Sequence, residues 1–190
     1  MPRPPSLSRR SILCMRKFGL APVIGDKTEI LILGTLPSDV SLAEGEYYAN
    51  PTNDFWKLIG EVLNSSLETL SYERRIEMLK AHRIGLWDIY HNCVRPGSMD
   101  NDITERQLND FNELKRIAPA LRLVCFNGKE AGASEELLRD LGYATLVLPS
   151  SSGANRKNQE ERLRCWKSAP WSGYHRQVRG ERDRPSRLIR

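Results

Sequence analysis

Residues 29–40 read EILILGTLPSDV, an apolar run that stops at Gly34 and turns at once into a polar, proline-containing loop. An uninterrupted apolar run of this length predicts a strand buried on both faces, as strands of parallel sheets are. Three further runs of this kind follow: IGLWDIY at 84–90, LRLVCFNG at 121–128 and YATLVLPS at 143–150. The sequence therefore predicts a central, mainly parallel sheet of four strands.

Segments whose apolar residues have helical spacing lie between and after these runs. Thr104 and Gln107 have the spacing of a capping box, which predicts the start of one such helix. The expected helices are residues 53–63, a helix from Ser71 to Leu79, a helix from Thr104 to Ile117, a helix from Leu137 to Gly142 and a last helix that ends near Trp166. Strands that alternate with helices predict an α/β fold, here a three-layer sandwich with helices on both faces of the sheet.

The 190 residues are enough for one compact domain, which we place at residues 21–168. The formal net charge of +5 comes from the two ends of the chain. Residues 1–20 contain five Lys/Arg and no acid, which favours a flexible basic lead-in or a transit peptide. Residues 169–190 contain six Arg and no apolar face, and we expect a disordered basic tail. The predicted domain itself has a net negative charge, so any DNA-binding surface on it must be local.

Composition excludes several classes of protein. No apolar run approaches the roughly 20 residues that cross a bilayer, so we expect a cytoplasmic protein without a membrane partner. The four cysteines have long, irregular spacing and the three histidines have no ligand spacing, so we expect neither a metal nor another cofactor. Lys129 is expected on a helix surface, which argues against a Schiff-base lyase step.

The four predicted strands all end in polar segments that contain Gly or Pro. Ligands of open α/β sheets bind at the carboxyl ends of the strands, so these segments are expected to build one site. They are GTLPSD at 34–39, WDIYHNCVRPGSMDND at 87–102, FNGKEA at 126–131 and LPSSSGANR at 148–156.

The most informative segment is GTLPSDVSLAEGEYYANPTNDFW, at residues 34–56. A strand that ends in Gly-x-x-Pro leaves the N–H groups of Thr35 and Leu36 free to bind an anion or a carbonyl oxygen. Two tyrosines and two asparagines follow, and such residues stack nucleic-acid bases, read base edges or hold water. The segment lacks the glycine patterns of dinucleotide sites and phosphate loops.

This segment resembles motif 1 of the uracil-DNA glycosylase superfamily, especially the branches of mismatch-specific uracil glycosylases and hypoxanthine-DNA glycosylases. Those branches share a Gly-x-x-Pro turn followed by an aromatic residue, a proline and N-x-F-W. LPSSSGANR resembles the second motif of the superfamily, and the resemblance covers roughly residues 20–168. It implies a uracil-DNA glycosylase-like fold and a monofunctional DNA glycosylase that starts base excision repair. Such an enzyme hydrolyses the N-glycosidic bond of uracil or hypoxanthine flipped from DNA.

The resemblance also implies roles for individual residues. Asn53 is the catalytic candidate, expected to hold a water through its side-chain oxygen, and Asn50 is the alternative. The base would stack on Tyr48 and be read by Asp88, as a carboxylate that accepts a ring N–H, and by the backbone of Thr35 and Leu36. The residues expected to bind DNA are Ser150, Ser151, Ser152, Asn155 and Arg156.

Two positions depart from most branches of the superfamily. Leu36 stands where an Asp or Asn usually orients water, and Leu148 stands where a His usually contacts the leaving base. The hypoxanthine-type branch shares both departures, which supports that branch.

Two other functions remain open from the sequence. One is a non-catalytic DNA-binding protein on the same fold, and the other is a nucleotide-binding α/β enzyme unrelated to DNA. For the glycosylase we expect a monomer whose partner is DNA with a deaminated base. The choice among uracil, hypoxanthine and xanthine, and between single- and double-stranded DNA, stays open.

Overall fold

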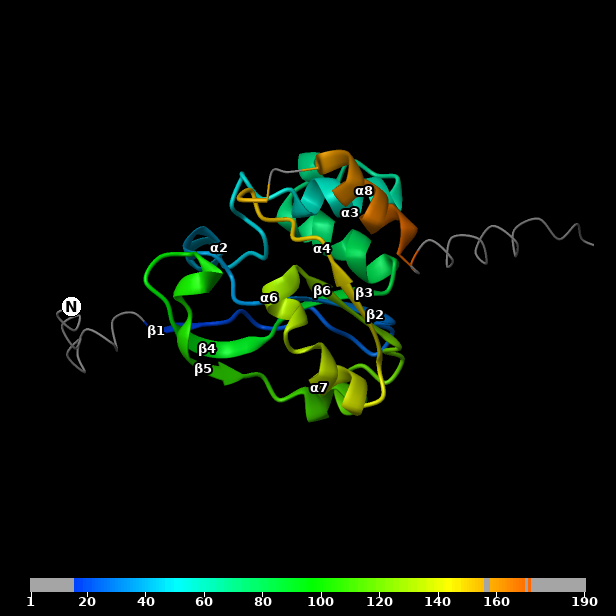
Figure 1. Cartoon of the computed structure of the whole chain (residues 1–190). Helices are drawn as coiled ribbons and strands as arrows, with labels where there is room; N and C mark the ends of the chain where they lie inside the picture. The colour runs from blue at the N-terminus through cyan, green and yellow to red at the C-terminus, as the bar shows by residue number, and fades with distance from the viewer. Residues whose placement is uncertain (1–15, 156–157, 170, 172–190) are drawn as a thin grey trace, which may run out of the picture.

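The computed structural model describes residues 16–155, 158–169 and 171. Its centre is a four-stranded parallel sheet in the order β3-β2-β6-β7 (Figure 1). The strands are β2 (Ile30–Gly34), β3 (Ile84–Asp88), β6 (Leu123–Asn127) and β7 (Ala144–Leu148). This confirms the predicted four-stranded sheet and places each strand inside its predicted apolar run.

Both faces of this sheet are covered by helices, as the three-layer prediction requires (Figure 1). Ile30 and Ile32 of β2 pack into one core with α3 (Phe55–Leu63), α4 (Tyr72–Ala81) and α8 (Gln159–Ser168). Leu31 and Leu33 point to the opposite core, with α5 (Leu114–Ile117), α6 (Lys129–Gly132) and α7 (Glu135–Asp140). Alternate residues of one strand therefore serve two cores, which explains its uninterrupted apolar sequence.

A second sheet of three antiparallel strands was not predicted. Its order is β1-β4-β5, with β1 at Arg16–Phe18, β4 at Tyr90–Val94 and β5 at Thr104–Leu108. The helix predicted to start at Thr104 is therefore wrong, and helical turns begin only at η3 (Phe111–Glu113) and α5. The two supposed capping residues bond across to β4 instead, Thr104 Oγ1 to the Val94 carbonyl and Gln107 Oε1 to Asn92 Nδ2. Pairing with β4 has overridden the local pattern.

The packed part of the chain extends past both limits that we predicted. Strand β1 lies within the expected basic lead-in and pairs with β4. Trp171 is only 2% exposed and donates its indole N–H to the Trp166 carbonyl at 2.7 Å, beyond the expected limit at residue 168. Residues 1–15, 170 and 172–190 of the two basic ends lie outside the described residues.

Short elements complete the loops around the sheet. They are α2 (Asp39–Glu44), η1 (Leu67–Thr69) and η2 (Asp100–Asp102). Among the described residues, no helix has both the length and the apolar character needed to span a membrane.

Candidate active site

The carboxyl ends of the four parallel strands surround one cavity of about 270 Å³. The register of the sheet explains why distant residues meet there, because Gly34 pairs with Asp88 and Asn127 pairs with Leu148. Eight of the site residues proposed from the sequence line this cavity, together with Asn127, Asp100 and other residues that the sequence analysis did not single out. The eight are Thr35, Leu36, Tyr48, Asn53, Asp88, Ser150, Ser151 and Ser152, and the alternative catalytic residue Asn50 joins them.

The turn after β2 is held from behind by a buried guanidinium group. Arg95 is 1% exposed, and it donates to the carbonyl of Leu36 at 3.3 Å and to the carbonyl of Pro37. Among the loop backbone hydrogen bonds of the described ranges, none is donated by Thr35 or Leu36. With its carbonyls bound by Arg95, the turn can offer these N–H groups to an oxygen atom in the cavity.

Tyr48 is fixed in place from two sides. Its ring stacks on Phe55 with centroids 3.8 Å apart and planes 12° apart, and its hydroxyl accepts a hydrogen bond from Asn127 Nδ2 at 3.2 Å. The backbone of Tyr48 has a φ of 56°, a left-handed conformation that costs energy outside glycine. Phe55 covers one face of the ring, so a base in the cavity can contact only the other face or the edge.

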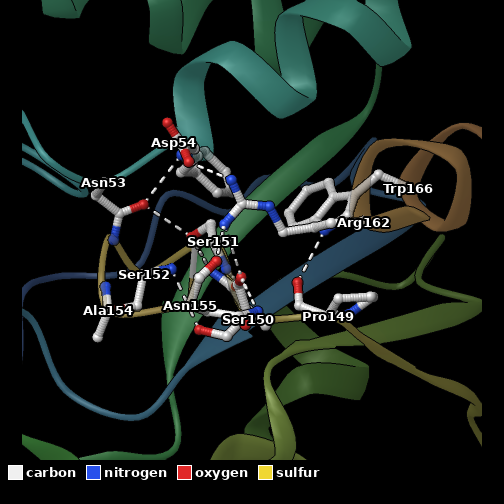
Figure 2. A network of polar contacts seen from close by, with 12 residues as sticks. Asn53, Asp54, Pro149, Ser150, Ser151, Ser152, Ala154, Asn155, Arg162 and Trp166 are labelled. Carbon is white, nitrogen blue, oxygen red and sulfur yellow. Dashed lines mark hydrogen bonds and ion pairs between the residues drawn. The ribbon is translucent and has the colours of Figure 1, made fainter. Parts of the chain in front are cut away.

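A chain of hydrogen bonds joins the two motif segments through Ser151, which is completely buried (Figure 2). Asn127 Nδ2 donates to Ser151 Oγ at 2.8 Å, and Ser151 Oγ donates to Asn53 Oδ1 at 2.8 Å. The backbone N–H of Ser151 returns a bond to Asn127 Oδ1 at 2.8 Å. This network links the ends of β6 and β7 to the start of α3.

The same network changes what Asn53 can do. Its side-chain oxygen accepts from Ser151 Oγ and from the backbone N–H of Phe55, so both acceptor positions are occupied. The oxygen of Asn50 is likewise taken, by the N–H and hydroxyl of Thr52. The expectation that Asn53 holds a water through its oxygen therefore does not match the geometry. Its amide NH2 group is the part left to act in the cavity, and that group is a hydrogen-bond donor.

Asp88 lies at the end of β3 and is 2% exposed. Burial, which disfavours the charged form, is the largest cause that raises its pKa to about 7. Its Oδ2 atom has no hydrogen-bond partner among the described residues, and Oδ1 is the carboxyl oxygen beside Gly34. As a carboxylate, Asp88 can accept a ring N–H, the role expected from the sequence, and protonation near neutral pH removes this charge.

A second carboxylate, Asp100, also lines the cavity. Its Oδ1 accepts from Thr35 Oγ1 at 2.8 Å and lies 3.8 Å from Arg95 Nη1. Its Oδ2 accepts none of the hydrogen bonds among the described residues, and burial is the main cause that raises the pKa of the group. Asp100 lies in the polar segment 87–102 that the sequence pointed to, but no spacing or motif distinguished it from the neighbouring Asp102.

The loop after β7 is braced by α8 (Figure 2). Arg162, 4% exposed, forms an ion pair with Asp54 and donates to the carbonyl of Asn155 at 2.9 Å. The Asn155 side chain donates to the Ser150 carbonyl at 3.1 Å, so it is used inside the loop and does not line the cavity. Arg156 lies outside the described residues.

The loop also approaches the motif 1 segment very closely. A Cβ atom on Gly153 would stand 2.3 Å from the carbonyl oxygen of Thr52, closer than atoms can pack. Only glycine fits this position without displacing one of the two segments.

Within the described residues, no group of three or more His, Cys, Asp or Glu side chains is arranged to hold a metal ion. The groups that face the cavity are amides, hydroxyls, backbone N–H groups and two carboxyls. Such a set can bind a polar base, stabilise an anion and orient a water molecule.

Comparison with known proteins gives a consistent result. The family model described as the uracil DNA glycosylase superfamily matches residues 21–170. The chain is 49% identical over 154 residues to a hypoxanthine DNA glycosylase of Methanosarcina acetivorans, covering 81% of this chain and 98% of that protein. It is 47% identical over 155 residues to a hypoxanthine DNA glycosylase of Methanosarcina barkeri, covering 82% of this chain and 98% of that protein.

The chain is also similar to a more distant relative in sequence and to a solved structure. A G/U mismatch-specific uracil DNA glycosylase of Schizosaccharomyces pombe is 28% identical over 130 residues, covering 65% of this chain and 38% of that protein. The solution NMR structure of a protein from Methanosarcina acetivorans described as a uracil DNA glycosylase superposes with a TM-score of 0.78 at 48% identity. That match covers 85% of this chain and all of the other.

Proposed function

The chain belongs to the uracil DNA glycosylase superfamily and is a DNA glycosylase, and we propose that its substrate is hypoxanthine flipped out of DNA. The reaction is hydrolysis of the bond between the base and C1′ of deoxyribose, the first step of base excision repair. The two relatives at 49% and 47% identity that are named hypoxanthine DNA glycosylases support this choice. We propose that the enzyme acts as a cytoplasmic monomer.

The observation that carries this proposal is the cavity at the strand ends, which both motif segments line. Its volume of about 270 Å³ leaves room for a flipped base. The choice of hypoxanthine over uracil rests on the two relatives named hypoxanthine DNA glycosylases.

We propose that Asp88 reads the ring N–H of the base. Hypoxanthine carries a hydrogen on N1 that a carboxylate oxygen can accept, whereas the N1 atom of adenine is itself an acceptor. An N–H donor beside Asp88 stabilises its charged form, which burial alone disfavours. Recognition of hypoxanthine therefore offsets part of the desolvation of Asp88, and adenine gives no such compensation.

The departing base gains negative charge as the glycosidic bond breaks. We propose that the N–H groups of Thr35 and Leu36 and the amide NH2 of Asn53 stabilise this anion. Donors that are already fixed in a water-poor site contribute most to such stabilisation. The bonds from Ser151 and Phe55 to the Asn53 oxygen turn the NH2 group of Asn53 in one direction.

The water that attacks C1′ needs an acceptor for its proton. Since the oxygens of Asn50 and Asn53 are occupied, we propose that Asp100 orients this water through its second oxygen. Its negative charge also stabilises the cationic sugar of the transition state. This carboxylate takes the place of the group that Leu36 lacks.

A panel of oligonucleotides tests the function. Each oligonucleotide carries a single hypoxanthine, uracil or xanthine, in single- and double-stranded form, and is treated with alkali after incubation with enzyme. We expect cleavage at hypoxanthine to exceed cleavage at uracil. Absence of cleavage on every substrate, with DNA binding retained, would favour the non-catalytic alternative.

A further inference from the structure

The β4–β5 loop places an exposed apolar side chain at the cavity. Met99 is 55% exposed, among the most exposed large apolar side chains of the described residues, and it lines the same cavity as Asp88 and Asn53. It belongs to neither core cluster, so packing does not account for it. A single exposed apolar side chain is ordinary on a protein surface, but this one lines the cavity, where bound DNA would contact it.

The backbone that carries Met99 is held on both sides. Lys17 Nζ donates to the Gly97 carbonyl at 2.6 Å, and the backbone N–H of Asp39 donates to Ser98 Oγ at 2.9 Å. On the other side, Thr35 Oγ1 binds Asp100, and the N–H of Asp102 donates to the Met99 carbonyl at 3.1 Å. In Figure 1 this green loop lies beside α2. Met99 is therefore an exposed side chain on a backbone held by hydrogen bonds on both sides.

The described part of the other loop at the cavity, residues 150–155, carries no side chain of this kind. Residues 150–154 are three serines, a glycine and an alanine, and the Asn155 side chain is bonded within the loop. When a base leaves a duplex, it leaves a gap in the stack, and proteins that open base steps commonly insert an apolar wedge there. Among the described residues that line the cavity, Met99 combines apolar character, reach and exposure.

We propose that Met99 enters the base stack of duplex DNA and fills the space left by the flipped nucleotide. This inference rests on the proposed function, because it assumes that the cavity receives a base extruded from DNA. It predicts a role that depends on the duplex, since a single strand has no opposing stack to refill.

Single-turnover cleavage of one hypoxanthine-containing strand, alone and in duplex, tests this role. Met99→Ala should slow cleavage in the duplex about tenfold or more, equal to about 1.4 kcal/mol of lost transition-state stabilisation. Cleavage of the single strand should change less than about twofold, within the range of surface substitutions. Met99→Leu restores an apolar side chain and should cleave the duplex nearly as fast as the wild type.

Leu137→Ala is the matched control, because Leu137 is 38% exposed on α7 and does not line the cavity. It should cleave both substrates like the wild type. If Met99→Ala slowed cleavage equally on both substrates, or slowed it on neither, the proposed wedge role of Met99 would be contradicted.

A second measurement does not depend on which base is released. The affinity for a duplex that carries a tetrahydrofuran abasic analogue is compared with that for the undamaged duplex of the same sequence. We expect the wild type to prefer the gapped duplex and Met99→Ala to lose most of that preference. An unchanged preference in Met99→Ala would contradict the proposed wedge role of Met99, whichever base the enzyme releases. Failure to cleave at hypoxanthine, by itself, would contradict only the proposed substrate.

Discussion

Ser151 Oγ donates a hydrogen bond of 2.8 Å to Asn53 Oδ1, across 98 positions of sequence. This contact joins the two segments that resemble superfamily motifs, and together with the N–H of Phe55 it decides which end of the Asn53 amide faces the cavity. The serine is completely buried, so the bond is shielded from competing water.

Substitution of Asn53 distinguishes a donor from an acceptor. Asn53→Ala should lower single-turnover cleavage about 10²-fold, the usual cost of losing one fixed donor. Asn53→Asp keeps the acceptor for Ser151 but removes the NH2 group and adds a charge beside a developing anion, so it should be at least as inactive. High activity of Asn53→Asp would instead support the water-holding role expected from the sequence. Circular dichroism checks that both variants fold.

Substitution of Asp100 tests the proposed water-orienting carboxylate. Asp100→Asn can still accept from Thr35 but loses the base and the charge, so cleavage should fall about 10²-fold. Affinity for lesion-containing DNA should change little. Asp102→Asn, on the same short helix and exposed, is the control and should cleave normally. If Asp100→Asn retained wild-type cleavage, another group would have to orient the water.

The pKa of Asp88 predicts that stability falls as pH rises. The folded-state pKa of about 7 lies above the ordinary 3.8, so the folded protein binds more protons than the unfolded chain between these values. The free energy of unfolding should therefore decrease from about pH 4 to about pH 7, by up to about 4 kcal/mol for this group. Thermal or urea unfolding at several pH values measures this trend. The difference between wild type and Asp88→Asn isolates it, and a pH-independent difference would contradict it.

The same titration affects recognition of the base. If the carboxylate accepts N1–H, cleavage at subsaturating DNA should rise between about pH 6 and pH 8 as Asp88 loses its proton. Asp88→Asn should remove that rise. Persistence of the rise in this variant would assign it to a different group.

Gly153 should not tolerate a side chain. In Gly153→Ala, the new Cβ would stand 2.3 Å from the Thr52 carbonyl oxygen, so the 150–155 loop must move away from the Asn50–Asn53 segment. We expect destabilisation of about 1–3 kcal/mol and slower cleavage, because overpacked sites shift their backbone. Gly25→Ala is the control, since nothing lies within 4 Å of its Cβ. Wild-type stability and cleavage for Gly153→Ala would show that the two segments can separate freely.

A cut after Trp171 removes the basic carboxyl-terminal end and keeps Trp171 and every described residue before it. Residues 172–190 contain six Arg and two acidic residues, and they lie outside the described residues. Their deletion should weaken binding to undamaged and damaged DNA alike and reduce the slope of affinity against salt concentration. The cleavage rate at saturating enzyme should stay nearly constant. A large fall in that rate would place this segment in the site.

Local sequence patterns determined the central sheet and most of the site. Four apolar runs predicted the four parallel strands, because strands buried on both faces leave no room for polar alternation. The carboxyl ends of such strands gather at one edge, so Thr35, Leu36 and Asp88 could be placed together before the structure was known. The resemblance added Tyr48, Asn53 and the serines of the 150–152 segment, all of which line the cavity.

Tertiary structure decided what depends on contacts between distant residues. Thr104 and Gln107 fit a helix start locally, but pairing with β4 makes their segment a strand. Asp100 reaches the cavity because Thr35, 65 positions earlier, donates to it. Likewise, the contact from Ser151, 98 positions away, joins the local N–H of Phe55 in orienting the Asn53 amide. Such contacts depend on packing and on the need to satisfy buried polar groups. Neither requirement produces a periodic pattern in the sequence.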